Sequence, residues 1–125
     1  MYIKLSELFI YRQYKAYPIS FYFDRKTYTV VSSTFFCEHK YDEVYERFIP
    51  LFQIDEERIQ DNFIREFNNK KLLRDYENKT VCFEAFARDC SIWRQWWDYY
   101  KKIVYQIASD WCRDNHIRYV DTDTQ

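Results

Sequence analysis

The stretch 92–117, near the C-terminus, constrains the fold of this chain more than any other feature. At about 100° of rotation per residue, a helix over this stretch places most of its apolar side chains in one arc. That arc includes all four tryptophans of the chain. The apolar side carries Trp93, Trp96, Trp97, Tyr100, Ile103, Val104, Ile107, Ala108 and Trp111, and the opposite side carries Arg94, Gln95, Asp98, Lys102, Gln106, Ser109 and Arg113. We therefore predict a long amphipathic helix whose tryptophan-bearing face lies in the core.

Alternating side chains in the first third of the chain predict a β-hairpin. Residues 19–23 alternate apolar and polar side chains, as a half-buried strand does. Residues 28–32 are rich in β-branched side chains, which favour strands. Asp24 lies between the two strands and can accept a hydrogen bond from the backbone of the turn. A third short strand is predicted over 48–52, where Pro50 indicates a sheet edge or a bulge.

Capping residues indicate where the other helices begin. Ser6, Asp55 and Thr80 each precede an apolar pattern with helical spacing, as N-cap residues do. The expected helices cover 7–14, 56–67, 70–76 and 81–90, and Ser91 or Asp89 can begin the long C-terminal helix. No linker or repeat interrupts the chain. We predict one α+β domain over 1–120, with a two- to three-stranded antiparallel sheet, three or four helices and a polar tail over 121–125.

The chain contains no glycine, whereas about 7% would be ordinary. Phosphate-cradling loops and nucleophile elbows that depend on glycine are therefore excluded, and with them several large enzyme classes. Helix ends must use other residues. Because asparagine tolerates the left-handed conformation best after glycine, we expect Asn68 and Asn69 to end one helix. Asn115 and His116 are expected to end the long one.

Charge and hydropathy indicate the cellular location of the protein and the kinds of partner it favours. The 19 basic and 20 acidic residues nearly cancel, so overall charge favours neither a nucleic acid nor an anionic membrane. Residues 38–57 hold seven acidic against two basic side chains. This is either a solvated acidic face or a docking patch for a basic partner. No apolar run approaches the ~20 residues that span a membrane, and no signal peptide is evident. We expect a cytoplasmic protein with reduced cysteines.

Zinc binding is the most specific metal hypothesis. The site would join Cys37 and His39 with Cys112 and His116, because four thiolate and imidazole ligands suit zinc. Cys112 and His116 are expected at the shoulder of the buried stripe, so that neither is forced into the core. However, Cys-x-His is an uncommon half-site and no pattern brings residue 37 near residue 112. Ordinary packing is the simpler interpretation, and we predict no metal and no cofactor.

Catalysis is not predicted. A nucleophilic cysteine needs a histidine and an orienting acid, and neither of the two histidines has a flanking signature. The consecutive carboxylates Asp42 and Glu43, and those that follow Asp55, are better explained by solvation and helix capping than by acid–base chemistry. We therefore predict a protein that is not an enzyme.

Six short patterns, taken in order, resemble one protein family. They are 47–51 (RFIPL), 63–67 (FIREF), Asn69 with Leu72 and Leu73, 82–86 (CFEAF), 108–112 (ASDWC) and 115–117 (NHI). Their order and spacing resemble uncharacterised protein family 0158, a placeholder-named group of small bacterial proteins, over about residues 21–117. The glycines expected from that resemblance fall at residues 27–28, 80–81 and 115–116, so the chain looks like a divergent member. The resemblance implies the fold and a bacterial or phage setting, but no reaction, cofactor or site residue.

Two kinds of macromolecular binding remain open. Tyrosine and arginine outside a core anchor protein interfaces, and Tyr99 and Tyr105 are expected on the flanks of the long helix near Lys101 and Lys102. We therefore predict a protein-binding module, an adaptor or an inhibitor of a host or defence protein. The alternative is binding of RNA or single-stranded DNA, because tyrosines stack on bases and a basic link is present. The residues of that link are Arg65, Lys70, Lys71 and Arg74.

Overall fold

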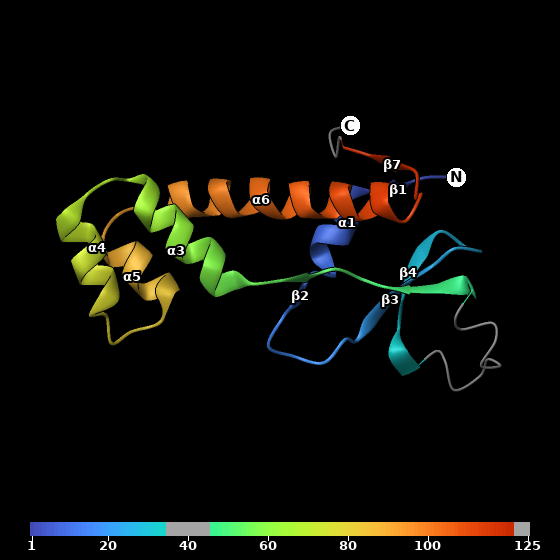
Figure 1. The fold of residues 1–125 in the computed structure, drawn as a ribbon, viewed down its shortest axis with the longest axis horizontal. Coiled ribbons are helices and arrows are strands. Elements are labelled where there is room, and N and C mark those ends of the chain that lie inside the picture. The colour runs from blue at the N-terminus through green and yellow to red at the C-terminus, as the bar shows by residue number, and fades with distance from the viewer. Residues whose placement is uncertain (35–45, 122–125) are drawn as a thin grey trace. The chain divides into compact units, whose positions relative to one another are not determined.

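Short strands and helices follow one another along the computed structural model, which describes residues 1–34 and 46–121 (Figure 1). The predicted α+β class with a long C-terminal helix is confirmed. The chain gathers into two compact units: a first unit of Met1–Ile54 with Val104–Gln125, and a second unit of Asp55–Ile103. Helix α6 (Trp93–Asp114) begins in the second unit and ends in the first. A single domain over 1–120 stays a prediction.

The first unit contains a three-stranded antiparallel sheet. Strand β3 (Phe21–Asp24) lies between β4 (Thr29–Ser32) and β5 (Phe48–Pro50). The predicted hairpin and third strand are therefore confirmed, with bounds that differ by one or two residues. The carboxylate of Asp24 accepts a hydrogen bond of 2.9 Å from the amide of Lys26, as we predicted for this turn.

Tyr28 closes the hairpin loop in an unusual conformation. Its φ of 58° lies in the left-handed region, which bulky side chains seldom occupy. The Tyr28 ring packs edge-on against Phe23, with the ring centroids 5.0 Å apart. Its hydroxyl oxygen accepts a hydrogen bond of 2.8 Å from the amide of Arg118. These tertiary contacts offset the conformational cost of a loop that has no glycine.

Two short parallel strand pairs were not predicted. Strand β1 (Ile3–Lys4) pairs with β7 (Tyr119–Val120), so the two ends of the chain lie side by side (Figure 1). Strand β2 (Gln13–Tyr14) pairs with β6 (Gln53–Ile54). Two-residue strands show no periodic pattern, and their partners are distant in sequence. Val120, the last residue of the predicted domain, therefore lies in a strand.

Helix α1 (Leu5–Ile10) also differs from expectation. It begins directly after β1, its N-cap residue is Lys4, and Ser6 lies inside the helix instead of capping it. It ends before Gln13 because that residue enters β2. The buried Gln13 amide accepts hydrogen bonds from the backbone of Ser20 and Phe21 at 2.6 and 3.0 Å. A local capping signal was thus overridden by strand pairing on both sides of the helix.

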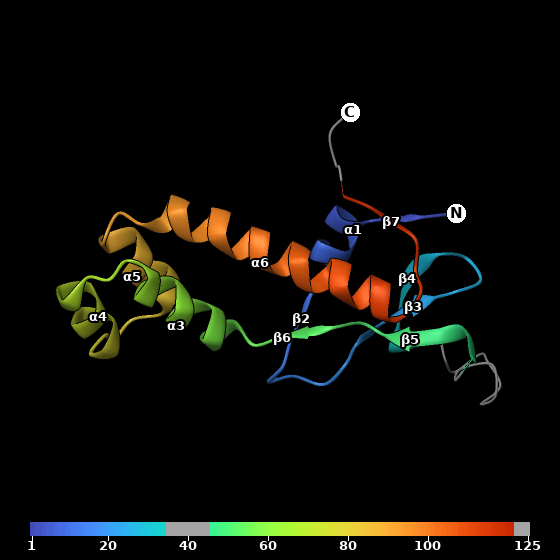
Figure 2. The ribbon, with the colours of Figure 1, turned by 45° about the horizontal axis from the view of Figure 1, so that its top comes forward.

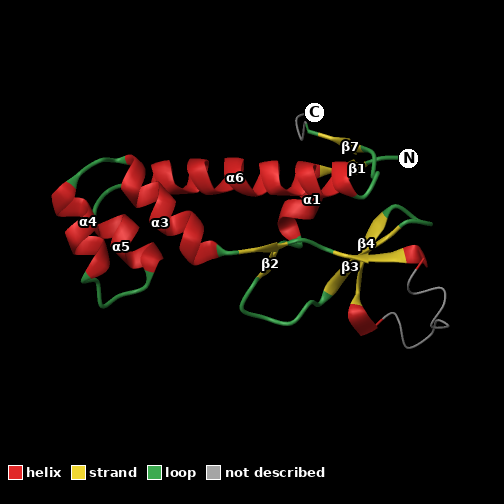
Figure 3. Cartoon of the chain, viewed as in Figure 1, coloured by secondary structure: helices red, strands yellow, loops and turns green. Residues whose placement is uncertain are grey.

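The second unit is helical throughout (Figures 2 and 3). Helices α3 (Glu56–Glu66), α4 (Lys70–Glu77) and α5 (Phe83–Asp89) join the first part of α6. The Trp96 ring lies in its core, 4.7 Å from the ring of Phe83 and 5.4 Å from that of Phe63. Asp55 caps α3 by accepting a hydrogen bond from the amide of Arg58, as predicted. The N-cap residue of α5 is Cys82 and not Thr80.

Three helices end on left-handed residues other than glycine. Asn68, Ser91 and His116 have φ of 51°, 59° and 57°. The last two close Schellman motifs, in which the amides of Ile92 and Ile117 donate to carbonyl oxygens five residues earlier, at 2.9 and 2.8 Å. The roles of Asn68 and His116 as helix ends are confirmed. Asn69 instead caps α4, and Ser91 ends α5 rather than beginning α6.

The burial of α6 departs from the single apolar arc. The most deeply buried apolar side chains of the helix recur every four residues: Trp96, Tyr100, Val104, Ala108 and Cys112. Trp97 is 37% exposed, so the prediction that all tryptophans face the core is wrong. Ser109, expected on the polar side, is buried. Trp96 packs against Phe63 and Phe83 of the second unit, whereas Trp111 packs against Phe23 and Phe52 of the first, so one arc does not describe both parts of α6. No helix in the described part of the chain is long and apolar enough to cross a membrane.

Candidate functional site

A buried carboxylate organises one end of the three-stranded sheet. The side chain of Asp24 is fully buried and accepts two hydrogen bonds from the guanidinium of Arg47, at 2.7 and 2.8 Å. The Lys26 amide and the Thr27 hydroxyl each donate to it at 2.9 Å. Burial alone would raise the pKa of Asp24, but these hydrogen bonds and the charge of Arg47 outweigh it and lower the pKa to about 2. Asp24 is therefore a structural anion that holds the hairpin turn to the start of β5.

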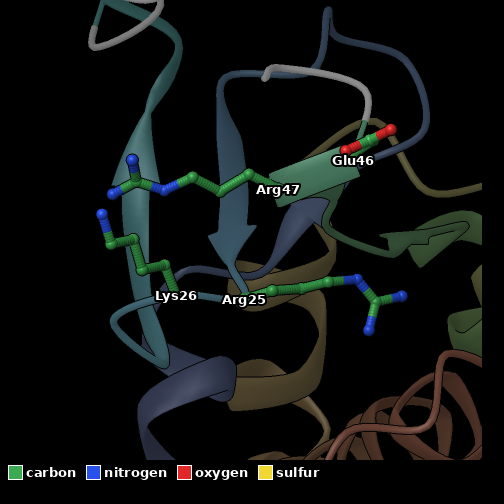
Figure 4. Close-up of a pocket in the computed structure, with 4 residues that line it drawn as sticks. All are labelled: Arg25, Lys26, Glu46 and Arg47. Atoms are coloured by element: carbon green, nitrogen blue, oxygen red, sulfur yellow. The ribbon is translucent and has the colours of Figure 1, made fainter. Parts of the chain in front are cut away.

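A basic hollow of about 370 Å³ adjoins this ion pair. The described residues that line it are Arg25, Lys26, Glu46 and Arg47. In Figure 4, Lys26 and Arg47 extend in the same direction, whereas Arg25 points away from them. Arg47 is paired with Asp24, but neither Arg25 nor Lys26 forms an ion pair with a described residue. The hollow thus has two cations without carboxylate partners in the described chain.

The outer edge of β4 presents backbone groups that bond to no described residue. The amide of Ser33 donates to the carbonyl of Ser20 at 2.8 Å. In an antiparallel pair, the residues of a strand direct their N–H and C=O groups alternately toward and away from the neighbouring strand. Because Ser33 directs its backbone toward β3, Val31, which lies opposite Tyr22, does so as well. The intervening residues, Val30 and Ser32, direct their N–H and C=O groups to the outside. No described strand pairs with this edge.

The opposite edge of the sheet is blocked at Pro50. Leu51 donates its amide to the carbonyl of Phe21 at 3.2 Å, so the same alternation directs Pro50 outward. Pro50 has no N–H, and its carbonyl oxygen accepts a hydrogen bond of 3.2 Å from the indole of Trp111. Proline on an exposed edge prevents further strand pairing, whereas β4 contains neither a proline nor a charged residue. The two edges of one sheet are thus protected to different degrees.

The predicted tyrosine anchors are half-buried. Tyr99 belongs to the second unit, where its ring lies 5.2 Å from that of Phe63. Burial, together with the charge of Glu66, raises the pKa of Tyr99. Tyr105 belongs to the first unit, and its ring lies 5.6 Å from that of Phe9. These intramolecular ring contacts reduce the area that either tyrosine offers to a partner, while Lys101 and Lys102 are exposed.

The basic link is partly gathered into one place. Arg65, near the end of α3, and Lys70, at the start of α4, line a second hollow of about 220 Å³ together with Asn68 and Asn69. The guanidinium of Arg65 donates to Asp61 at 2.8 Å, and this bond and charge raise the pKa of Arg65. The remaining residues of the link, Lys71 and Arg74, are exposed on α4.

The zinc hypothesis loses support at Cys112. Its side chain is fully buried in α6, so the expected place at the shoulder of the apolar stripe is wrong. Burial raises the pKa of Cys112 to about 12, although Arg113 opposes the shift, and the thiolate that zinc requires is disfavoured. His116 is exposed at the helix end. The other proposed ligands, Cys37 and His39, lie outside the described residues, among which no cluster of three or more possible metal ligands occurs.

Comparison with known proteins finds no match among family models, curated proteins or solved structures. Membership of uncharacterised protein family 0158 therefore stays a prediction. Two of the three places at which the resemblance expects glycine contain a residue with positive φ, namely Tyr28 and His116. Glycine adopts that conformation without steric cost. The assignment of a function consequently depends on the geometry of the chain itself.

Proposed function

We propose that this chain is a non-enzymatic protein-binding module that receives an extended segment of a partner protein on the outer edge of β4. The observation that supports the proposal is the difference between the two edges of the sheet. One edge is blocked at Pro50, whose carbonyl oxygen is bonded by Trp111, and the other presents the backbone of Val30 and Ser32. Strand addition to an exposed edge is a recurring mode of peptide recognition, in which backbone hydrogen bonds contribute affinity.

The size of the edge sets the strength of such binding. Val30 and Ser32 offer up to four backbone hydrogen bonds, each with a net contribution of about 0.5–1.5 kcal/mol. Association costs ~4–15 kcal/mol in lost translational and rotational freedom. Four hydrogen bonds alone therefore give weak binding, and side-chain contacts beside β4 must add to them. Arg25 and Lys26, which form no ion pair with a described residue, lie in the turn that leads into this strand.

The proposal includes a setting as well as a surface. Small size, the lack of a catalytic sequence signature and the resemblance to a bacterial family favour an adaptor, or an inhibitor of a host or defence protein, in a bacterial or phage cytoplasm. The geometry adds a mode of contact to this proposal. It also moves the expected contact surface from Tyr99 and Tyr105 to β4.

A matched pair of variants tests strand addition. Val30→Pro removes the outward N–H and leaves the bonds to β3 in place, whereas Val30→Thr retains the N–H and the branched shape. Wild-type protein and both variants are immobilised and exposed to a nuclease-treated bacterial lysate. We expect a protein partner that is retained by wild type and by Val30→Thr but lost with Val30→Pro, while circular dichroism shows the same folded state for all three. Equal recovery with all three proteins would reject β4 as the binding edge.

Binding of RNA or single-stranded DNA is the second candidate function. It is favoured by one observation, the position of Arg65 and Lys70 around a common hollow. Fluorescence anisotropy of a labelled oligonucleotide, measured at increasing salt, tests it. Phosphate contacts predict affinity that falls steeply with salt, and Lys70→Ala with Lys71→Ala should weaken binding at low salt and reduce the salt dependence. An oligonucleotide that binds wild type and the double variant equally would reject this candidate.

A further inference from the structure

The direction of a strand added to β4 follows from the sheet itself. This step rests on the proposed function of the β4 edge. Strand β3 pairs antiparallel with both of its neighbours, and antiparallel pairing is slightly the more stable arrangement. An antiparallel segment would form hydrogen-bonded pairs with Val30 and Ser32. Thr29 and Val31 would then lie in non-hydrogen-bonded pairs, in which opposed side chains approach most closely.

Thr29 and Val31 share one face of the sheet with Asp24. In the register of the hairpin, Thr29 lies opposite Asp24 and Val31 lies opposite Tyr22. The Thr29 hydroxyl lies 2.7 Å from that of Thr27, which in turn donates to the Asp24 carboxylate. Hydrogen bonds therefore link the face of β4 that begins at Thr29 to the Asp24–Arg47 ion pair, and Arg47 also lines the basic hollow.

The charges at this end of β4 determine which kind of side chain of a bound segment is favoured opposite Thr29. Asp24 already compensates Arg47, whereas Lys26 has no ion pair with a described residue. Figure 4 shows the Lys26 side chain extended in the same direction as that of Arg47, whose partner Asp24 lies opposite Thr29. A carboxylate opposite Thr29 would complement Lys26, and a basic side chain there would be repelled. Opposite Val31, an apolar side chain would form a favourable cross-strand pair.

We infer that the segment bound by β4 is an acidic extended peptide that runs antiparallel to the strand. An antiparallel segment meets Val31 before it meets Thr29. Its apolar residue therefore precedes its acidic residue by two positions. The partner is thus a protein with an exposed segment of the pattern apolar–any–acidic, and the carboxylate lies beside Lys26.

Synthetic peptides test this pattern on the full chain. The probe contains Ile-Thr-Glu within a neutral threonine-rich segment, and comparison peptides contain Ile-Thr-Gln, Ile-Thr-Lys or the reversed order Glu-Thr-Ile. Nuclear magnetic resonance titration follows the amide signals of Val30 and Ser32 and yields a Kd for each peptide. Because exposed ion pairs contribute modestly, we expect the glutamate peptide to bind about two- to five-fold more tightly than the glutamine peptide at low salt. We expect the lysine peptide and the reversed peptide to bind more weakly still.

Charge exchange shows whether Lys26 is responsible. Lys26→Glu should abolish the preference for the glutamate peptide and favour the lysine peptide, whereas Arg94→Glu, at an exposed site in the second unit, should leave every Kd unchanged. Equal affinity for the glutamate, glutamine and lysine peptides overturns the inference, as does tighter binding of the reversed peptide. If in that case binding still disappears with Val30→Pro, the proposed function stands without the acidic pattern. If Val30→Pro binds peptides and lysate partner as wild type does, both fail.

Discussion

The indole Nε1 of Trp111 donates a hydrogen bond of 3.2 Å to the carbonyl oxygen of Pro50. The two residues are far apart in sequence, and their contact occupies the outward carbonyl group of the β5 edge at Pro50. The same Trp111 ring packs against Phe23 and Phe52, with centroids 6.1 and 5.9 Å away. Trp111 therefore combines two tasks, packing against the sheet and blocking one of its edges.

Replacing Trp111 by phenylalanine separates these tasks. Phenylalanine keeps an aromatic ring beside Phe23 and Phe52 but removes the N–H. We expect Trp111→Phe to lower the free energy of unfolding by about 1 kcal/mol, the usual net contribution of a hydrogen bond. Urea unfolding followed by circular dichroism measures the change. The control is Trp97→Phe, at a partly exposed site, and a larger loss for that variant would contradict the assignment.

Hydrogen exchange reports directly on the open edge. The amides of Val31 and Ser33 are directed toward β3, and those of Val30 and Ser32 are directed outward. We expect the Val30 and Ser32 amides to exchange with solvent much faster than the two inward ones, because solvent reaches them without any opening of the sheet. Amide-resolved exchange measures the four rates in one sample. Equal protection of all four would show that the edge is covered.

The ion pair of Asp24 makes stability depend on acid pH. Its pKa is lowered from 3.8 to about 2 in the folded chain, so this contribution is complete above the unfolded value and is lost as pH falls toward the folded value. We expect wild type to lose about 2 kcal/mol of unfolding free energy between about pH 5 and pH 2 from this residue. Asp24→Asn should be less stable at neutral pH and lack this part of the slope. Parallel pH profiles for both proteins, measured by urea unfolding, would contradict the assignment.

Glycine at the end of α6 should stabilise the chain. His116 occupies the left-handed region, which costs a residue with a Cβ about 1–2 kcal/mol. Glycine avoids this cost and loses some of the gain to greater chain entropy when unfolded. We expect His116→Gly to raise the free energy of unfolding by about 0.5–1 kcal/mol. Asn115→Gly is the matched control and should destabilise, because the Asn115 side chain donates to the carbonyl of Trp111 at 2.8 Å.

The cysteines should differ in reactivity. Cys82 is exposed, Cys90 is half-buried and Cys112 is fully buried, with a pKa raised to about 12. Because the thiolate is the reactive form, iodoacetamide at about pH 8 should modify Cys82 readily and leave Cys112 unmodified until urea unfolds the chain. Peptide mapping by mass spectrometry assigns the modified sites. Modification of Cys112 in the folded protein would contradict its place in the core.

Interactions that span a few residues were predicted correctly. Asp55 bonds an amide three residues later, and Asp24 bonds one two residues later. Asn68 takes the left-handed conformation at the end of α3. Side-chain chemistry and backbone geometry over such short distances depend little on the remainder of the fold, so composition and order suffice. The same holds for the α+β class and for the long helix.

Burial along that helix required the tertiary structure. Periodicity placed Trp97 in the core and Cys112 at its shoulder, and the structure exposes the first and buries the second. Trp97 and Cys112 lie in parts of α6 that belong to different units. A single apolar face, derived from helical periodicity, applies to a helix that packs against one neighbour. It does not apply to a helix whose two parts pack against different elements.

At the candidate site, too, some features follow from the amino-acid sequence and others only from the tertiary structure. The amino-acid sequence determined that residues 28–32 favour a strand, that Pro50 indicates a sheet edge or a bulge, and that Arg25 and Lys26 occupy the intervening turn. Only the tertiary structure decided that Val30 and Ser32 are the residues whose backbone faces outward, because a one-residue slip against β3 would exchange them for Val31. It also paired Asp24 with Arg47 and placed Lys26 with Arg47 around one hollow. Register and long-range ion pairs arise from the packing of the whole chain, and no local pattern contains them.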